Sequence, residues 1–316
     1  MTTNNQKELH AVTGAFGYSG QYIAHRLLSE GKSVCTLTNS PGRDSQLARS
    51  LDVRPLAFDQ PDALSQALRN VNVLYNTYWV RFDHKNFSHA QAVDNTLRLF
   101  DAAKRAGVER VVHVSITNPS LSSRLGYFRG KAELEQALIS SGMSHAILRP
   151  AVLFGGVDIL INNIAWMLRT FPVFGTFGDG QYKLQPIHVE DFAELAVMEG
   201  GSAENHIVNA IGPETFSYRE LVQVISQAIG KRRPIIQLPP SLGLLMSRIM
   251  GWFVRDVVIT RDEIKGLMDN LLHVEDKPAG GTRLTDWANA NFAMLGKRYA
   301  NELRRRKDRQ KAYAAR

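Results

Sequence analysis

The sequence predicts an α/β protein with a doubly wound parallel sheet and a smaller C-terminal lobe. Three observations lead to this prediction: apolar strand-like runs alternate with helical segments from residue 9 onward, a glycine-rich turn follows the first run, and the alternation changes beyond Gly156. Strands that alternate with helices of about three turns imply parallel pairing, right-handed crossovers and helices on both faces of the sheet.

The alternating elements of the first half can be placed from their periodicity. Each strand is a short apolar run, and each helix has apolar residues at helical spacing, the first ending at Gly31. The expected strands are 9–14, 33–39, 53–58, 71–79, 110–116 and 145–155, and the expected helices are 21–31, 63–70, 95–107 and 131–142.

The domain boundaries follow from the change of pattern. We expect the sheet domain over residues 1–156, with 181–210 packing back onto it, a smaller substrate or partner lobe over 157–180 and 211–300, and a basic tail at 301–316. Within the lobe, Ser217 and Glu220 have the spacing of a capping box at the start of a helix.

An apolar segment, "SLGLLMSRIMGWFV" at 241–254, has two interpretations. A membrane span needs about 20 apolar residues, so this segment is too short. It is either a helix whose apolar face is buried in the lobe, which we favour, or an interfacial helix that inserts Met246, Met250, Trp252 and Phe253 into a bilayer.

The amino-acid composition narrows the class of protein and the kinds of site that the chain can hold. With 44% hydrophobic and 22% charged residues the chain has the profile of a soluble globular protein. The single cysteine, Cys35, lies in an apolar strand, which indicates a buried thiol and excludes an internal disulfide. The histidines and acids show no metal-ligand spacing, so we expect no metal. The N-terminus lacks the pattern of a signal peptide, and we expect a cytoplasmic location.

The net charge of +8 is concentrated at the C-terminus, where residues 297–316 hold nine Lys or Arg against two acids. This tail is either a solvated helix end or an anchor for an anionic membrane surface or an acidic protein partner. An anchor of this kind would place the protein peripherally at the inner face of a membrane. The tail lacks aromatic residues interleaved at groove spacing, which argues against nucleic acid.

The glycine-rich turn is the first motif that carries function. Gly14, Gly17 and Gly20 stand between the first strand and the first helix. In that context the first glycine permits a tight turn, the second lets the backbone approach a pyrophosphate, and the third allows close helix packing. The motif therefore predicts a dinucleotide site of the Rossmann type.

The end of the second strand indicates which dinucleotide binds. An acidic residue there would bind the ribose hydroxyls of NAD, but the sequence offers Thr38, Asn39 and Ser40, followed by Arg43. Arg43 is suited to pair with a 2′-phosphate. We therefore expect NADP in preference to NAD, although Asp44 lies beside Arg43.

Tyr127 and Lys131 form the candidate catalytic pair. They are four residues apart, so both project from one helix face. A nearby ammonium lowers the pKa of a tyrosine hydroxyl, which otherwise titrates near about 10 and is a poor proton donor at neutral pH. Ser115 and Thr117 are candidate hydroxyls for orienting a substrate carbonyl, with Thr117 the better placed.

The stretches "TGAFGYSG", "YFRGK", "LRPAVLFG" and "QPIHVEDFAELA" together resemble the short-chain dehydrogenase/reductase superfamily in its extended and atypical branches. The C-terminal part is similar to the branch that contains NmrA-like proteins and the dehydrogenase-like accessory subunit of respiratory complex I. The stretch between Thr117 and Tyr127 is shorter than in sugar epimerases of the superfamily, which argues against a nucleotide-sugar substrate.

This resemblance implies a role for each matching residue. It places Gly14, Phe16, Gly17, Tyr18 and Ser19 around the pyrophosphate, Asn39 and Arg43 at the adenosine ribose, Asp59 at the adenine, Thr77 along the cofactor, Pro150 and Val152 beside the nicotinamide, Lys131 also at the nicotinamide ribose, and Tyr127, Lys131 and Thr117 in the catalytic group.

Two functions follow. The first is an NAD(P)H-dependent oxidoreductase that acts on a small hydrophobic carbonyl or alcohol, with Tyr127 as general acid and base. The second is a non-catalytic dinucleotide-binding scaffold, sensor or accessory protein that meets a partner or a membrane. The intact Tyr127 and Lys131 pair favours the first.

Overall fold

The computed structural model describes residues 8–39 and 46–308, which fall into two compact units. The first holds the chain up to Arg149 together with Ala193–Val208. The second holds Pro150–Phe192 and the chain from Asn209 onward. The chain thus passes into the second unit seven residues earlier than the boundary expected after Gly156, because the strand that follows Pro150 pairs within the second unit.

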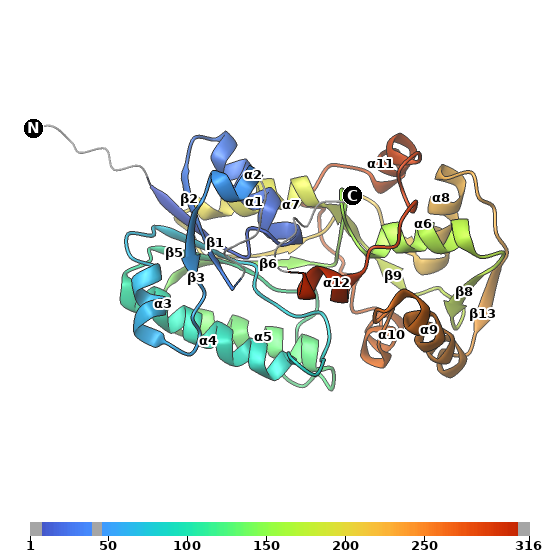
Figure 1. The fold of residues 1–316 in the computed structure, drawn as a ribbon, viewed down its shortest axis with the longest axis horizontal. Coiled ribbons are helices and arrows are strands. Elements are labelled where there is room, and N and C mark those ends of the chain that lie inside the picture. The colour runs from blue at the N-terminus through green and yellow to red at the C-terminus, as the bar shows by residue number, and fades with distance from the viewer. Residues whose placement is uncertain (1–7, 40–45, 309–316) are drawn as a thin grey trace, which may run out of the picture. The chain divides into compact units, whose positions relative to one another are not determined.

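A seven-stranded sheet forms the centre of the first unit (Figure 1). Its strand order is β11-β6-β5-β4-β1-β2-β3, and the pairs from β3 to β6 are all parallel, which confirms the predicted fold class. The strands are β1 (Leu9–Thr13), β2 (Ser33–Thr38), β3 (Asp52–Pro55), β4 (Val73–Asn76), β5 (Arg110–Val114), β6 (Ser144–Pro150) and β11 (His206–Ala210).

Helices cover both faces of this sheet. One face carries α3 (Pro61–Ala67), α4 (His89–Ala106) and α5 (Gly126–Ser140), and the other carries α1 (Tyr18–Ser29) (Figure 1). The C-terminal half of α7 (Val189–Gly200) lies beside α1, since Arg26 and Glu194 form an ion pair of 3.1 Å. The short α2 (Gln46–Arg49) follows β2. Leucines of α3, α4 and α5 pack on buried residues of the central strands to form the core.

Two elements of the first unit differ from their predicted bounds. Helix α4 begins at His89 instead of residue 95, because Ser88 caps it by accepting a hydrogen bond from the backbone N–H of Gln91. The run at 145–155 is not one strand. It divides at Ala151 into β6 and β7 (Val152–Phe154), and these two strands belong to different sheets.

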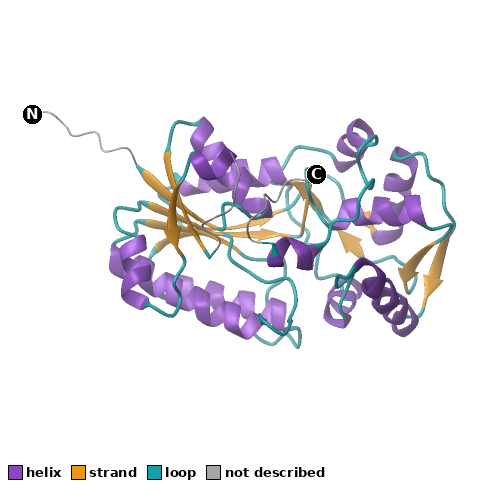
Figure 2. Ribbon diagram, viewed as in Figure 1, coloured by secondary structure: helices purple, strands orange, loops and turns teal. Residues whose placement is uncertain are grey.

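The second unit is built on three two-stranded sheets and six helices (Figure 2). Strand β7 pairs with β10 (Pro186–His188) and β8 (Phe174–Phe177) with β13 (Ile235–Leu238), both in parallel, whereas β9 (Lys183–Leu184) and β12 (Phe216–Ser217) are antiparallel. The helices are α6 (Leu160–Thr170), α8 (Tyr218–Ala228), α9 (Pro240–Val254), α10 (Arg261–Met268), α11 (Leu284–Asn291) and α12 (Glu302–Lys307).

The capping box predicted at the start of α8 is confirmed. Ser217 Oγ accepts a hydrogen bond from the backbone N–H of Glu220 at 3.2 Å, and the Glu220 carboxylate accepts one from the backbone N–H of Ser217 at 2.7 Å. These bonds favour the charged carboxylate and lower the pKa of Glu220. They hold the N-terminus of a helix that packs Leu221 and Val222 into the second core.

Helix α9 corrects our preferred interpretation of the apolar segment. The helix is present, but the residues it buries are small: Gly243, Ser247 and Gly251. A Cβ on Gly243 would lie 2.6 Å from the Phe177 ring, so the backbone of α9 lies directly on β8. Most of the large apolar side chains of α9 are exposed instead, while Leu244, Met250 and Val254 are half-buried. Within the residues described, no helix combines the length and the apolar character that a membrane span requires.

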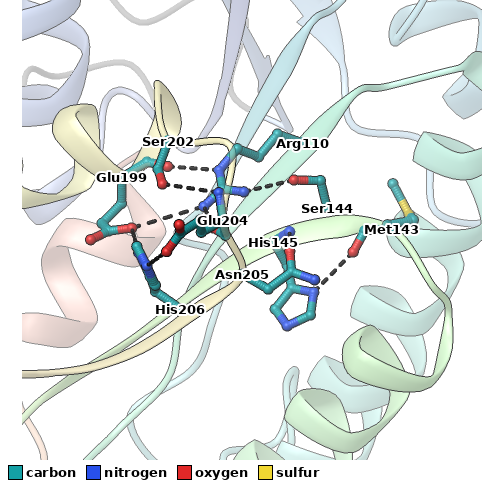
Figure 3. Close-up of polar contacts among 9 residues, drawn as sticks. All are labelled: Arg110, Met143, Ser144, His145, Glu199, Ser202, Glu204, Asn205 and His206. Carbon is teal, nitrogen blue, oxygen red and sulfur yellow. Dashed lines mark hydrogen bonds and ion pairs between the residues drawn. The ribbon is translucent and has the colours of Figure 1, made fainter.

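A buried arginine ties the returning segment to the sheet (Figure 3). The Arg110 guanidinium donates hydrogen bonds to the carbonyl oxygens of Glu199 and Glu204, each at 2.7 Å, and to Ser144 Oγ at 2.6 Å. His206 bridges the same two acids: its Nδ1 lies 2.8 Å from Glu199 and its Nε2 lies 3.3 Å from Glu204. This cluster fixes the end of α7 and the entry to β11 against β5 and β6.

The cluster makes a prediction about pH. Hydrogen bonds and charge from Glu199 and Glu204 raise the pKa of His206 above its usual value of about 6.5. His206 therefore stabilises the fold below the unfolded-state pKa, and this contribution is lost as the pH rises through the higher folded-state pKa. Urea unfolding at a series of pH values should show His206→Gln less stable than the parent protein in acid, with the difference shrinking toward alkaline pH.

The matched control is His25→Gln, which removes an exposed histidine of α1. The difference in unfolding free energy between His25→Gln and the parent protein should not change over the same pH range. A flat profile for His206→Gln as well would contradict the assigned ion pairs.

Candidate functional site

The glycine turn brings β1 and α1 into very close contact. Gly14 adopts a left-handed φ of +66°, and its N–H donates a hydrogen bond to the Leu37 carbonyl at 3.1 Å. The Gly14 carbonyl accepts a hydrogen bond from the N–H of Gly17 at 2.7 Å. A Cβ on Gly20 would lie 2.4 Å from that same carbonyl oxygen, so only glycine fits there. Gly14 thus makes the tight turn and Gly20 the close helix packing that their spacing predicts.

The N-terminus of α1 is suited to phosphate. Gly17 is the N-cap of this 12-residue helix and offers no side chain that caps the first N–H groups. A helix N-terminus without a side-chain cap presents backbone N–H groups and a partial positive charge to an anion. The turn leaves space where a Cβ would otherwise stand, so Gly14, Gly17, Tyr18 and Ser19 fit the pyrophosphate of a dinucleotide.

The tight turn predicts the effect of adding a Cβ at Gly20. Gly20→Ala forces a Cβ against the Gly14 carbonyl and should cost roughly 1–3 kcal/mol of unfolding free energy, as overpacking does. It should also weaken dinucleotide binding, because the turn must open. Gly201→Ala is the control, since a Cβ there meets the Met198 carbonyl at an ordinary 3.6 Å. Urea denaturation and fluorescence titration with NADPH measure both effects, and equal behaviour of the two variants would contradict this account.

Polar side chains join the strand ends on either side of the turn. The strand order changes direction between β1 and β4, where doubly wound sheets bind their ligands. Here Thr13 Oγ1 donates to Asn76 Oδ1 at 3.0 Å and accepts from the N–H of Thr77 at 2.9 Å. Thr77 Oγ1 in turn donates to the Thr13 carbonyl at 2.5 Å. Thr77 therefore lies beside Gly14, and its place along the cofactor stays a prediction.

Sequence reasoning missed three residues of this region. Thr36 Oγ1 accepts a hydrogen bond from the N–H of Ala15 at 3.2 Å and so supports the turn from β2. Thr13 and Asn76 form the network just described. The available signal was that all three are polar residues in otherwise apolar strands, two of them at a strand end.

The residues predicted for the adenosine half lie at the ends of β2 and β3. Asn39 directly follows β2 and is exposed, and Asp59 is exposed shortly after β3. Phe16 is buried within the glycine turn. Arg43, on which the preference for NADP depends, lies outside the described residues, as does Asp44.

Lys131 is enclosed in the first unit. Its side chain is 2% exposed, its Nζ donates a hydrogen bond to the Val114 carbonyl at 2.6 Å, and the ammonium stands 4.2 Å from the centre of the Trp79 ring. Burial lowers the pKa of Lys131 to about 7, against the opposing charge of Glu135. Trp79 is held tightly, since a Cβ on Gly130 would lie 3.1 Å from its ring.

Tyr127 lies in an aromatic cluster that the sequence did not reveal. Its ring meets Trp79 edge-on at 5.5 Å and His89 at 5.6 Å between ring centres. The Trp79 and His89 rings are stacked on each other at 5.9 Å. Asp83 holds His89 by accepting a hydrogen bond from its backbone N–H at 2.6 Å. The cluster thus joins the loop after β4, the start of α4 and the start of α5.

The two hydroxyls at the end of β5 are both buried, and Ser115 is bound to an interior carboxylate. Ser115 Oγ donates to Glu135 Oε1 at 2.5 Å, and the same carboxylate accepts from Arg149 Nε at 2.9 Å. Ser115 is therefore bound to this interior ion pair instead of being placed for a substrate. Thr117 is fully buried after β5. His113 accepts a hydrogen bond from Asn76 Nδ2 when Nε2 carries its proton, and burial keeps its pKa well below the usual value.

The remaining predicted residues lie elsewhere. Pro150 ends β6 and Val152 begins β7, and both belong to the second unit. Cys35 is buried in β2, and burial raises the pKa of its thiol to about 11, which fits an unreactive core residue. Over the described ranges, no three His, Cys, Asp or Glu side chains are grouped so that they could hold a metal ion.

Comparison with known proteins defines the class. A family model for NAD(P)H-binding domains matches residues 14–158, which span the glycine turn and the strands on both sides of it. An NADPH-dependent quinone oxidoreductase from Escherichia coli, solved with NADPH, has the same fold with a TM-score of 0.72 and 21% identity over 90% of this chain and 99% of that one. The protein is an NAD(P)H-binding protein with a Rossmann-type sheet.

Two relatives define the family of this chain more narrowly. The mitochondrial NADH dehydrogenase (ubiquinone) 1 alpha subcomplex subunit 9 of Rattus norvegicus is 30% identical over 277 residues, covering 84% of this chain and 71% of that protein. An NmrA-like family domain-containing oxidoreductase of Aspergillus flavus is 26% identical over 249 residues, covering 73% and 75%. The chain belongs to the family of the alpha subcomplex subunit 9, and the resemblance inferred from its motifs is confirmed.

Proposed function

We propose that this protein is a non-catalytic NADP(H)-binding accessory protein, in which the bound dinucleotide stabilises the first unit and other surfaces meet a partner. The observation that carries the proposal is the enclosure of Lys131. Its Nζ is bonded to the Val114 carbonyl, its side chain is buried, and Trp79 covers it.

The enclosure weakens the chemistry that Tyr127 needs. Lys131 lowers the pKa of a tyrosine only while it is positively charged, and burial brings the pKa of Lys131 to about 7. The buried lysine therefore holds its positive charge less firmly than a lysine in water does. Ser115, the other hydroxyl considered for substrate, already donates to Glu135. Membership in a family named for subunits of NADH dehydrogenase (ubiquinone) supports the same proposal, with another protein chain as the partner.

A reductase is the second candidate, and one observation favours it. Trp79 Nε1 and His89 Nε2 are buried without a hydrogen-bond partner among the described residues, and both rings touch Tyr127. Buried polar atoms without a partner are costly, and a substrate carbonyl that accepts from Trp79 Nε1–H would remove that cost for the indole. In this case Tyr127 would supply the proton and the nicotinamide the hydride to a hydrophobic carbonyl.

Cofactor turnover separates the two candidates. We expect NADPH at a hundredfold excess over its Kd to stabilise the folded protein by about 2.7 kcal/mol. The Tm of the purified protein should rise accordingly. We also expect NADPH to remain unoxidised in the presence of hydrophobic aldehydes, ketones and quinones. Tyr127→Phe should change neither result. Steady oxidation of NADPH that disappears in Tyr127→Phe would establish the reductase instead.

Cofactor preference gives a further prediction. Arg43 is the cation expected beside a 2′-phosphate. Arg43→Ala should therefore weaken NADPH binding roughly tenfold or more and leave NADH binding nearly unchanged, as loss of a charge-assisted pair does. The control is Arg49→Ala, which removes the same charge from α2. Fluorescence titration of both variants with both cofactors measures the ratio. Equal affinities of the parent protein for NADPH and NADH would overturn the preference.

A further inference from the structure

One surface of the second unit has no role in dinucleotide binding. We call it the α9 outer face: a row of large apolar side chains at helical spacing on α9, which the fold leaves exposed. Trp252 is 77% and Phe253 71% exposed, and the others are between 44% and 53% exposed. The members are Leu242, Leu245, Met246, Ile249, Trp252 and Phe253.

These side chains are exposed although α9 packs against the rest of the second unit. Its opposite side packs on the unit through small buried residues: Gly243 lies against Phe177, a Cβ on Gly251 would lie 2.6 Å from the Asp256 carbonyl oxygen, and Ser247 between them is buried. Rotating α9 to bury Trp252 or Leu245 would drive large side chains into these contacts. The fold therefore holds the apolar row outward, and exposed apolar surface of this kind marks an interaction site.

Positive charge is fixed at one end of the row. Asn301 Nδ2 donates to the Val254 carbonyl at 2.7 Å, and the Asp256 carboxylate accepts the backbone N–H groups of Glu302 and Leu303 at 2.8 and 3.0 Å. These bonds hold the start of α12 at the C-terminal end of α9.

The exposed charged side chains of α9 and α12 are all positive, whereas Asp256 between the two helices is buried and Asp308 after α12 is half-buried. Arg304 and Lys307 of α12 are exposed, and Arg248 is exposed within α9 itself. The acid of α12, Glu302, is buried and paired with Arg306. The sequence continues beyond α12 with Arg309, Lys311 and Arg316.

We propose that the α9 outer face docks the protein on the surface of an anionic phospholipid bilayer. Trp252 and Phe253 enter the boundary between headgroups and acyl chains, and Arg304, Lys307 and Arg248 contact the lipid phosphates. Apolar and aromatic residues on an interfacial helix, with cations beside them, are the combination that binds such surfaces. The exposed cations of one sign favour a lipid surface over an uncharged apolar partner.

The test uses the full-length protein and vesicles of phosphatidylcholine, with or without phosphatidylglycerol. The protein should sediment with the anionic vesicles and hardly with the neutral ones. Added salt should weaken binding, because the Debye length falls to about 8 Å at physiological ionic strength. Tryptophan emission should shift to the blue on binding, and Trp252→Phe should remove that shift. Protein that stays in the supernatant with anionic vesicles at low salt overturns the proposal.

Two variant pairs assign the binding to this face. Trp252→Gln with Phe253→Gln should lower the partition coefficient roughly tenfold or more, since two large side chains lose their burial. The matched control is Phe292→Gln with Met294→Gln, which removes two apolar residues that are 52% and 71% exposed elsewhere in the second unit. An equal loss in the control pair overturns the proposal. Unchanged Tm values show that both variants are folded.

The cations are tested separately. Arg304→Gln with Lys307→Gln should weaken binding about fivefold per charge removed and should flatten its salt dependence. Lys231→Gln with Arg232→Gln, which removes two exposed cations outside α9 and α12, is the control. An unchanged salt dependence in the first pair, or the same loss in both pairs, overturns the part assigned to α12.

Discussion

The close approach of α1 to the Gly14 carbonyl is the constraint on which the first unit depends. Gly20 permits that approach, and Gly14 turns the chain in the left-handed region so that α1 starts directly above the end of β1. Thr36 and Thr77 hold the turn from β2 and from the end of β4. The helix N-terminus is thereby aimed at the point where the strand order reverses, which is where a dinucleotide phosphate is bound in this fold.

Buried and half-buried cations organise the rest of the first unit, and each is satisfied in a different way. Buried Arg110 donates to two backbone carbonyls and a serine, and so joins the returning segment to the sheet. Half-buried Arg149 is paired with Glu135. Lys131 has a single backbone carbonyl and an aromatic face, which is a weaker compensation for a charge removed from water. Burial lowers the pKa of Lys131 to about 7, and it also lowers the pKa of Arg110.

The second unit uses its large apolar side chains in two ways, in a buried core and on the exposed face of α9. Its core is filled by residues of α6, α8 and the short strands, so the large side chains of α9 are not needed for folding. Small residues give α9 its attachment, and the bulky ones remain for an external surface. The unit thus combines a conventional core with an apolar helix face beside fixed positive charge.

The α/β alternation, the glycine turn, the capping box of α8 and the family could be predicted from the sequence, because each depends on local periodicity or on fixed spacing along the chain. The placement of Tyr127 and Lys131 on one helix face could be predicted in the same way. Their surroundings could not, because Trp79 and Val114, which enclose Lys131, come from other elements of the chain. The same holds for α9. Its apolar pattern is local, but the side that it buries depends on Phe177 and Asp256, which lie too close to Gly243 and Gly251 for any side chain there.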